Sequence, residues 1–344
     1  MSTVLAVELA YWQQTVLRVV GVLAAVLLPA GTLVYVFLFK MMSHMQSRLG
    51  PMEAGPHGSL QLLAEVGKFL QKEDIAPERA DRRLFNLAPY LVVSAVLLVY
   101  VAVPFGPDAW FANLDVGIFD ALAVSSVSVI GILVAGWASA NKYSLLGGIR
   151  AAGQLIAYEL PLVLAVVGVV VQAGTMNLIG IVESQANGEI FGFDAVGLPF
   201  ILTQFVGFWI FLVATQAELT QTPFDMPVAE SELVTGYMTE YTGLRFLLFF
   251  IGEFASAGAF AAIAATLFLG GWWLPGLDVD ADYMNVVGPL VVLGKMMLVA
   301  FLVFWIRFTY PRFREDQLQM FAWKYLIPLS LVNILATAVL KVVL

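Results

Sequence analysis

Cysteine is absent from the 344 residues of this chain, and histidine occurs only twice, at His44 and His57. Without cysteine the chain can hold no thiolate-ligated iron–sulfur cluster, no cysteine-based zinc site and no disulfide. The two histidines both lie at or just beyond the end of the first apolar segment, so they cannot clamp a haem from facing helices. The sequence therefore predicts that this chain contains no redox centre and no metal site.

Charge is also scarce, because 12% of the residues are charged while 60% are apolar, and the mean hydropathy is +0.88. Soluble domains average about 45–50% apolar and about 25% charged residues. A bilayer core of about 30 Å needs about 20 apolar residues per helix. We expect an all-α integral membrane protein, a single polytopic domain over residues 1–344 with a bundle of about eight transmembrane helices. The predicted spans are 14–39, 87–104, 118–137, 153–173, 199–217, 244–270, 286–306 and 324–343.

Positive charge is distributed on one side of this pattern. Fourteen of the seventeen lysines and arginines follow odd-numbered spans, and the exceptions are Arg18, Lys295 and Lys341. The loops after the second, fourth and sixth spans hold acidic residues and no lysine or arginine. By the positive-inside rule, both termini are expected on the outer, periplasmic-type side. The predicted cytoplasmic loops cover residues of about 40–86, 138–152, 218–243 and 307–323.

The predicted loop 218–243 is unusually acidic for a segment beside a membrane. It has no lysine or arginine, and Pro223 and Pro227 interrupt any regular helix. Carboxylates in such a position suit proton uptake or the docking of a partner. The five acids are Glu218, Asp225, Glu230, Glu232 and Glu240.

A second segment, residues 58–72 of the first cytoplasmic loop, has the pattern of an amphipathic helix. Its polar side holds Glu65, Lys68 and Lys72, and its apolar side holds Leu62, Leu63, Val66, Phe69 and Leu70. Such a pattern is typical of a helix that lies in the membrane interface. Two interpretations remain open: a helix packed against the bundle, or a wall or entrance for an amphiphilic ligand such as a quinone.

Glu159, Glu253 and Lys295 are ionisable residues that lie well inside predicted spans. A charged group at a helix centre costs about 2.5–3.5 kcal/mol on insertion scales, so it usually faces a partner or water. Lys295 could pair with Glu159 or Glu253 as a structural ion pair. Two acids for one base leave a carboxylate over, however, and a buried carboxylate can exchange protons. Proton transfer is therefore the favoured interpretation of all three residues.

Several motifs, spread over nearly the whole chain, resemble one protein family in the expected order. They include Arg48-Leu49-Gly50-Pro51, Arg150 to Glu159, Thr222-Pro223-Phe224-Asp225, Glu240-Tyr241-Thr242-Gly243-Leu244-Arg245 and Pro311-Arg312-Phe313-Arg314. By these motifs the chain resembles the membrane component of respiratory complex I that holds the quinone chamber, which is the family of H subunits of the NADH:quinone oxidoreductases.

The resemblance implies a membrane subunit of a proton-translocating enzyme that forms the quinone entrance and part of the chamber. Quinone is the expected substrate, no cofactor is expected in this chain, and iron–sulfur clusters and flavin belong to partner subunits. The implied partners are hydrophilic iron–sulfur and quinone-site subunits on the cytoplasmic side, antiporter-like and small membrane subunits, and the lipid bilayer, with no nucleic acid. The implied location is a bacterial-type cytoplasmic (inner) membrane.

The resemblance also assigns roles to individual residues. The residues expected to couple quinone reduction to proton movement are Glu159, Glu218, Glu253, Asp225, Glu230, Glu232 and Glu240. Lys295 is expected to take part as well, because it lies inside a predicted span. Residues expected around the quinone chamber and its approaches are Arg48, Glu65, Lys68, Arg245 and Phe246.

Some positions depart from the family's usual pattern. Gln221 and Val228 stand where the family usually has an arginine and a glutamate, and these changes alter the charge of the acidic loop. Met52 and Glu53 replace the usual asparagine and arginine, which alters the interface or the entrance, and Ala140 replaces an asparagine.

Three other functions remain open. The chain could be the equivalent subunit of a related complex with another electron donor, such as a membrane-bound hydrogenase or a non-NADH quinone reductase. It could instead be a secondary transporter that uses Glu159, Glu253 and Lys295 around a midplane site. Finally, it could be a scaffold that anchors a soluble complex through its acidic loop.

Overall fold

The structure is a computed structural model that describes residues 11–188, 197–279, 281 and 283–343. Within these ranges the regular structure is helical, without a β-strand. The elements follow in the order α1 (Tyr11–Leu33), η1 (Val34–Met41), α2 (Met42–Met45), η2 (Pro56–Gly58), α3 (Gln61–Gln71), α4 (Arg82–Ala102), α5 (Gly117–Ser125), α6 (Val127–Ala138), α7 (Lys142–Ala173), α8 (Leu178–Ala186), α9 (Phe200–Thr203), α10 (Phe205–Glu218), α11 (Glu230–Leu233), η4 (Gly236–Met238), α12 (Gly243–Phe268), α13 (Met284–Thr309), α14 (Glu315–Phe321), η5 (Ala322–Leu326) and α15 (Ile327–Val343).

The expected helical membrane bundle is confirmed. In the described residues, seven helices are long and apolar enough to cross a membrane, and they cover Trp12–Met45, Arg82–Ala102, Gly117–Ala138, Lys142–Ala173, Gly243–Phe268, Met284–Thr309 and Glu315–Val342. The remaining predicted span, 199–217, corresponds to α9 and α10, which are separated at Gln204. On which side of a membrane the two termini lie stays a prediction.

Two predicted loops are shorter than the sequence suggested. Residues 142–152 were expected in a loop, yet α7 already begins at Lys142, because the Asn141 side chain caps it by accepting a hydrogen bond from the backbone N–H of Tyr143. The last helix likewise begins with α14 at Glu315 rather than at residue 324. Much of the predicted loops 138–152 and 307–323 is therefore helical, and their position on the cytoplasmic side stays a prediction.

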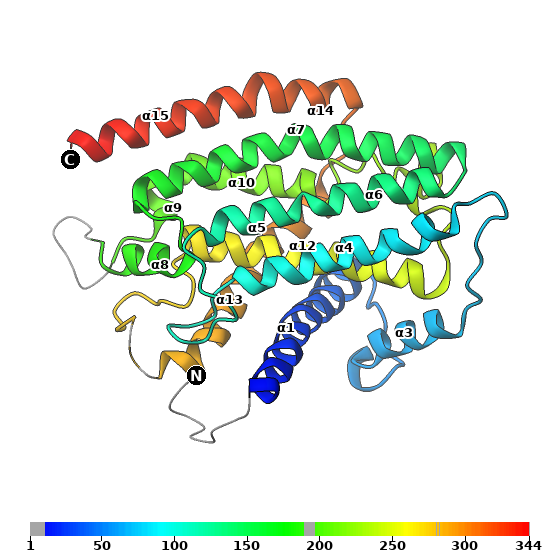
Figure 1. The fold of residues 1–344 in the computed structure, drawn as a ribbon, viewed down its shortest axis with the longest axis horizontal. Coiled ribbons are helices and arrows are strands. Elements are labelled where there is room, and N and C mark those ends of the chain that lie inside the picture. The colour runs from blue at the N-terminus through cyan, green and yellow to red at the C-terminus, as the bar shows by residue number, and fades with distance from the viewer. Residues whose placement is uncertain (1–10, 189–196, 280, 282, 344) are drawn as a thin grey trace.

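The long helices lie side by side along the longest axis of the molecule (Figure 1). Helix α7 contacts α6, α10 and α15, while α12 contacts α4, α13 and α1. Helix α1 crosses the bundle at an angle. The short α3 lies beside the end of the bundle where α7 begins, and it contacts both α12 and η1.

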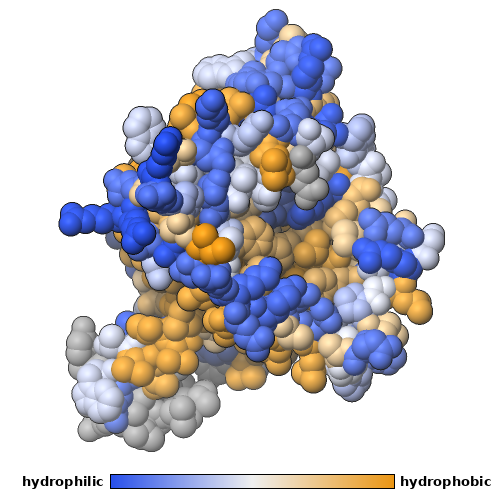
Figure 2. Space-filling view, turned by 90° about the vertical axis from the view of Figure 1, so that its right-hand side faces the viewer, coloured by the Kyte–Doolittle hydropathy of each residue, from blue (hydrophilic) through white to orange (hydrophobic). Residues whose placement is uncertain are grey.

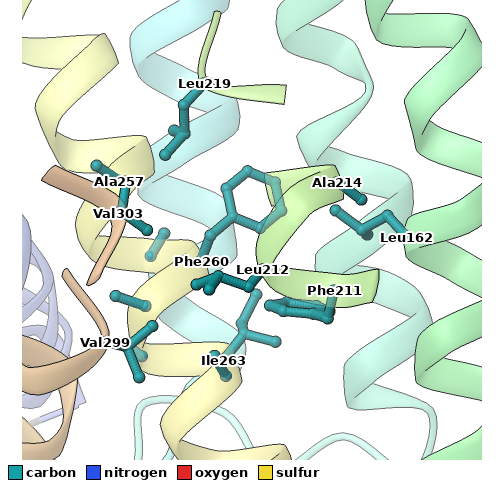
Figure 3. Close-up of a cluster of buried hydrophobic side chains, with 14 of the residues drawn as sticks. Leu162, Phe211, Leu212, Ala214, Leu219, Ala257, Phe260, Ile263, Val299 and Val303 are labelled. Atoms are coloured by element: carbon teal, nitrogen blue, oxygen red, sulfur yellow. The ribbon is translucent and has the colours of Figure 1, made fainter. Parts of the chain in front are cut away.

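Helix α12 is the centre of the core. Nearly all its residues from Phe254 to Phe268 are buried. Alanines and glycines allow neighbouring helices to approach closely, as in other membrane bundles. Phe260 and Ile263 of α12 meet Leu212 of α10 and Val303 of α13 (Figure 3). This packing holds α10, α12 and α13 in fixed positions, and these three helices supply charged residues to the site described below.

A polar cluster attaches α15 to the bundle. Gln204, at the break between α9 and α10, accepts a hydrogen bond from Asn333 Nδ2 at 2.8 Å. Its own Nε2 donates to Thr337 Oγ1 at 2.7 Å and to Gln172 Oε1 at 3.0 Å. Because unpaired polar groups are costly in a bilayer, these bonds fix the position of α15 against α7 and α10.

Candidate functional site

A charged cluster forms where the acidic loop 218–243 meets α12 and α13. The carboxylate Oε1 of Glu253, on α12, accepts hydrogen bonds from Gln221 Nε2 at 3.2 Å and from Arg307 Nη1 at 3.5 Å. The side chains of Glu253 and Arg307 are 26% and 25% exposed. The cluster therefore joins the loop to two long helices through a largely buried ion pair.

Two further acids, Glu218 and Glu159, lie close enough to each other to interact. Glu218 is the last residue of α10, and its Oε2 is buried without a hydrogen-bond partner among the residues that the structure describes. Its carboxylate interacts electrostatically with that of Glu159 on α7. Because like charges repel, the charge carried by one of these acids depends on the other.

Buried glutamines hold the first part of the loop in place. Gln154 Nε2 on α7 donates to the carbonyl oxygens of Ala217 and Phe224, both at 2.7 Å. Gln216 Nε2 donates to the carbonyl oxygen of Thr222 at 2.7 Å. These bonds pair carbonyl groups that no regular helix satisfies here, so Gln221 reaches Glu253 from a rigid segment.

The second part of the loop packs against the beginning of α7. Gly236 has a φ of +57°, and a Cβ atom there would lie 1.7 Å from the carbonyl oxygen of Pro227. A Cβ atom on Gly147 of α7 would lie 2.7 Å from the backbone nitrogen of Tyr237. Only glycine fits these two positions, so the loop lies directly against the helix.

Tyr237 lies within the electrostatic influence of one loop acid, Asp225, and of the buried acid Glu253. Burial raises the pKa of its hydroxyl, and the negative charges of Glu253 and Asp225 raise it further. The hydroxyl therefore stays protonated at neutral pH and can donate a hydrogen bond.

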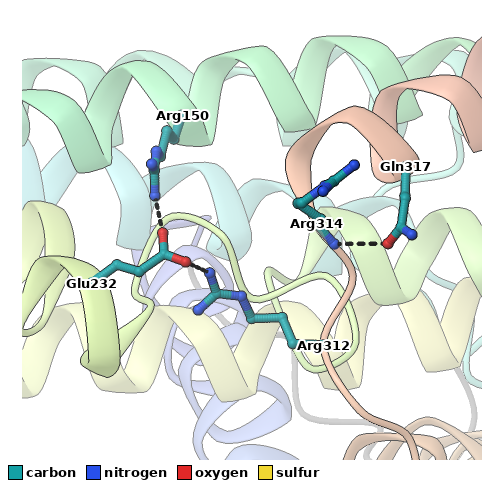
Figure 4. A network of polar contacts seen from close by, with 5 residues as sticks. All are labelled: Arg150, Glu232, Arg312, Arg314 and Gln317. Atoms are coloured by element: carbon teal, nitrogen blue, oxygen red, sulfur yellow. Dashed lines mark hydrogen bonds and ion pairs between the residues drawn. The ribbon is translucent and has the colours of Figure 1, made fainter.

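The outer part of the loop is held by ion pairs (Figure 4). Glu232 bonds Arg150 Nη1 at 2.6 Å and also pairs with Arg312. The hydrogen bond from Arg150 and the charge of Arg312 hold the pKa of the Glu232 carboxyl below its usual value. Glu240 accepts a hydrogen bond from the Asn141 amide. Glu230 begins α11, and its side chain lies outside the described residues.

The predicted chamber residues form a separate group around α3. Arg245 pairs with Asp74 at 3.0 Å, and its guanidinium lies 5.1 Å from the ring centroid of Phe85. Phe246 stacks on Phe69 of α3 with ring centroids 5.6 Å apart. Helix α3 is thereby attached to the first turn of α12.

The other chamber candidates are more exposed. Glu65 accepts hydrogen bonds from Lys68 and from Gln61 on the same helix, and the bond from Lys68 lowers the pKa of Glu65. Arg48 is exposed and donates to the side chain of Gln46 at 2.8 Å. The structure thus brings Arg245 and Phe246 together with α3, but it gives Arg48 only a local bond.

Lys295 lies far from the buried acids. Its Nζ donates to the carbonyl oxygens of Leu269 at 2.6 Å and Trp273 at 2.5 Å. Leu269 comes sixteen residues after Glu253, which is about 24 Å along a helix. Among the described residues no ion pair joins Lys295 to Glu159 or Glu253. The alternative of a structural Lys295–glutamate pair is therefore wrong, and Arg307 is the cation that faces Glu253.

Several residues of the site were not singled out by the sequence, namely Arg307, Gln154, Tyr237 and Asp74. Arg307 was counted only as a positive charge at the end of a span, although arginine at such an end can turn back toward a buried acid. No sequence pattern pointed to a role for Gln154 or Tyr237, since that role depends on contacts between segments that are distant in the sequence.

The end of the bundle that holds these loops is shown in Figure 2. Hydrophilic residues cover much of this face and surround a recessed area of hydrophobic residues. A surface pocket of about 410 Å³ lies at the beginning of α7, with Arg79, Lys142 and Glu240 in its wall. In the described residues no three His, Cys, Asp or Glu side chains are arranged to hold a metal ion.

Comparison with known proteins gives one family model and several relatives that match most of the chain. The sequence model of the NADH dehydrogenase family matches residues 17–338. The chain is 46% identical over 323 residues to the NADH-quinone oxidoreductase H subunit of Brevibacillus brevis, with 92% of each chain covered. It is 45% identical over 326 residues to an H subunit of the same enzyme from Syntrophobacter fumaroxidans, again with 92% of each covered. For the H subunit of Dehalococcoides mccartyi the identity is 44% over 310 residues, covering 90% of this chain and 82% of the relative.

Proposed function

This chain belongs to the NADH dehydrogenase family, the family of the NADH-quinone oxidoreductase H subunits, and from this premise we propose that it is the membrane subunit of a proton-translocating NADH:quinone oxidoreductase. It forms the quinone entrance and part of the quinone chamber, and it couples quinone reduction to proton movement. The observation that carries this proposal is the cluster of Glu253, Arg307 and Gln221, which joins the acidic loop to a carboxylate inside the bundle.

The quinone enters between α1, α3 and α12. Helix α3 contacts α12 and the π-helical continuation of α1, and none of its residues is buried. Leu63 and Leu70 of α3 are exposed, and Phe69 of the same helix stacks on Phe246 of α12. These side chains supply an apolar wall, while Arg245 supplies positive charge near the head group. Partner subunits that hold the iron–sulfur clusters and the flavin deliver the electrons.

Coupling follows from the charge that reduction places in the chamber. A unit charge about 4 Å from a carboxylate is worth about 4 kcal/mol at an effective dielectric constant of about 20. Each 1.36 kcal/mol changes the ratio of protonated to ionised carboxylate about tenfold, so the change is about a thousandfold. The loop acids change their protonation first. Glu253, Glu218 and Glu159 pass this change in protonation into the membrane, where neighbouring subunits use it to move protons.

We propose one membrane domain over residues 1–344 with the basic and acidic loops on the cytoplasmic side. The loop face in Figure 2 then receives the hydrophilic subunits. Both termini lie on the outer side of a bacterial-type inner membrane, and antiporter-like and small membrane subunits pack against the apolar surface of the bundle.

The proposal is tested with Glu159→Gln and Glu218→Gln in the assembled complex, reconstituted into vesicles. We expect the rate of proton transport driven by NADH to fall by about tenfold or more, equal to about 1.4 kcal/mol in the barrier. Glu183→Gln makes the same change at an exposed acid of α8 and serves as the matched control. Wild-type transport coupled to quinone reduction in both variants would show the assignment to be wrong.

The electron donor is tested by tagging the chain, extracting it in mild detergent and identifying the polypeptides that come with it. Iron–sulfur subunits, an NADH-oxidising flavoprotein and antiporter-like subunits support the proposal. Iron–sulfur partners without that flavoprotein, or with a nickel-site protein, overturn NADH as donor. A chain that comes out alone, under conditions that preserve other complexes, supports the transporter instead.

A further inference from the structure

A small cavity of about 30 Å³ lies beside Glu218, between α10, α4, α5–α6 and α12. Ser125, Ser128 and Ser256 line it, and apart from Glu218 the rest of its wall is apolar and includes Phe260. A cavity needs about 10–15 Å³ and two or more polar partners to hold a water molecule. This cavity therefore has the size and the chemistry of a site for one or two waters.

Buried polar atoms without a partner gather around the same end of α10. Among the described residues, seven buried side-chain atoms lack a hydrogen-bond partner, and five of them belong to segment 215–221 or to Gln154, which bonds this segment. The three glutamine orientations are fixed, because each Nε2 group already donates to an oxygen atom. Buried acceptors in native proteins are paired with protein groups or ordered water. The five residues are Thr215, Gln216, Glu218, Gln221 and Gln154.

We propose that this cavity is a water site in which bound water links the carboxyl group of Glu218 to the hydroxyl groups of Ser128 and Ser256. This inference rests on the proposed function, in which Glu218 exchanges protons. The water gives that proton a path from α10 across to α5–α6 and α12. Glu218, the bound water and the serine hydroxyl groups each accept one proton and donate one, so charge balances and no further reactant is needed.

The roles of the three serines differ. The Ser125 hydroxyl already donates to the carbonyl oxygen of Leu122 at 2.7 Å, so it can only accept from water. Ser128 of α6 and Ser256 of α12 lie in different walls of the cavity. Water between these two walls connects helices that flank Glu218, and the apolar remainder of the wall confines it there.

The test compares two changes at Ser256 in the assembled complex in vesicles. Ser256→Thr keeps the hydroxyl group but fills the cavity with a methyl group. Ser256→Ala removes the hydroxyl group but leaves room for water. We expect Ser256→Thr to slow proton transport about tenfold, equal to about 1.4 kcal/mol in the barrier, because no water fits. Ser256→Ala should slow it by only about threefold, because the water stays but loses one of its partners. Ser94→Thr, on the exposed side of α4, is the matched control and should have no effect.

The opposite order, with Ala impaired and Thr active, would mean that the hydroxyl acts directly and would overturn the water site. If both variants match the control while Glu218→Gln still abolishes transport, the water site is wrong and the proposed function stands. If Glu218→Gln is also harmless, both fail. Should Ser256→Thr not assemble, Ser128→Val fills the same cavity from α6. A map of the complex must also show water density within hydrogen-bond distance of Glu218, lost in Ser256→Thr.

Discussion

Replacing Arg307 by glutamine removes the cation that faces Glu253 inside the bundle. The two charged atoms lie 3.5 Å apart, and only about a quarter of each side chain is exposed. At this separation two unit charges attract by about 5 kcal/mol at an effective dielectric constant of about 20. Desolvation offsets much of that attraction, but an unpaired buried charge costs about 3–5 kcal/mol. We expect Arg307→Gln to destabilise the assembled chain by about 3 kcal/mol, the lower end of that range, because the pair is not fully buried.

The double variant separates stability from function. When Glu253→Gln is added to Arg307→Gln, no unpaired charge remains, so stability should recover by about 1.5–3 kcal/mol relative to Arg307→Gln alone. Proton transport should not recover, because the carboxyl group that couples it is gone. A structural ion pair without a coupling role would instead regain transport together with stability.

The assay is thermal release of this chain from the purified complex, combined with quinone reduction and proton uptake in vesicles. Arg83→Gln is the matched control, since Arg83 is exposed at the beginning of α4. If the loss of stability in the double variant equals the sum of the losses in Arg307→Gln and Glu253→Gln, the two charges do not interact and the predicted role of the ion pair is wrong.

Two further predictions concern Glu232 and Lys295. Glu232→Gln should lower stability by about 1 kcal/mol at pH 7, since half-exposed ion pairs contribute little. Because Arg150 and Arg312 hold the pKa of Glu232 below its ordinary 4.5, this difference is full above that pH and is lost as the pH falls below it. Melting curves of the wild type and of Glu232→Gln at pH 7 and at a pH below 4.5 check this. A stability difference that is the same at both pH values contradicts it. Lys295→Met should lower the melting temperature, because two carbonyl oxygens lose their donor, without changing protons moved per quinone reduced. Lost transport at an unchanged melting temperature would support the predicted coupling role instead.

The sequence predicted the features that depend on local pattern. Apolar runs located the long helices. The stripe on residues 58–72 located α3, because apolar residues on one face of a helix recur with the helical period. The helix ends were less predictable. Lys142 and Arg150 reduced the apparent hydropathy of the first turns of α7, although both residues favour helix formation and Asn141 supplies the cap.

The partners of the buried acids could not be predicted. Glu253 meets Gln221 from the loop and Arg307 from α13, and these contacts join segments that are 32 and 54 residues apart. No periodicity connects such positions, so the sequence offered Lys295, a base near the middle of a predicted span, as the candidate partner. The structure shows that Lys295 instead bonds the chain that follows α12.

The contacts of this cluster show what glutamine instead of arginine at position 221 changes. The resemblance led us to expect an arginine there, and Gln221 keeps a hydrogen bond to Glu253 at 3.2 Å without supplying a charge. A neutral donor holds a carboxylate about half as strongly as a charged one. Glu253 therefore depends on Arg307 for its charge balance, and the Arg307 variants measure that dependence directly. The departure from the family pattern thus affects the junction between the acidic loop and α12, where Gln221 meets Glu253.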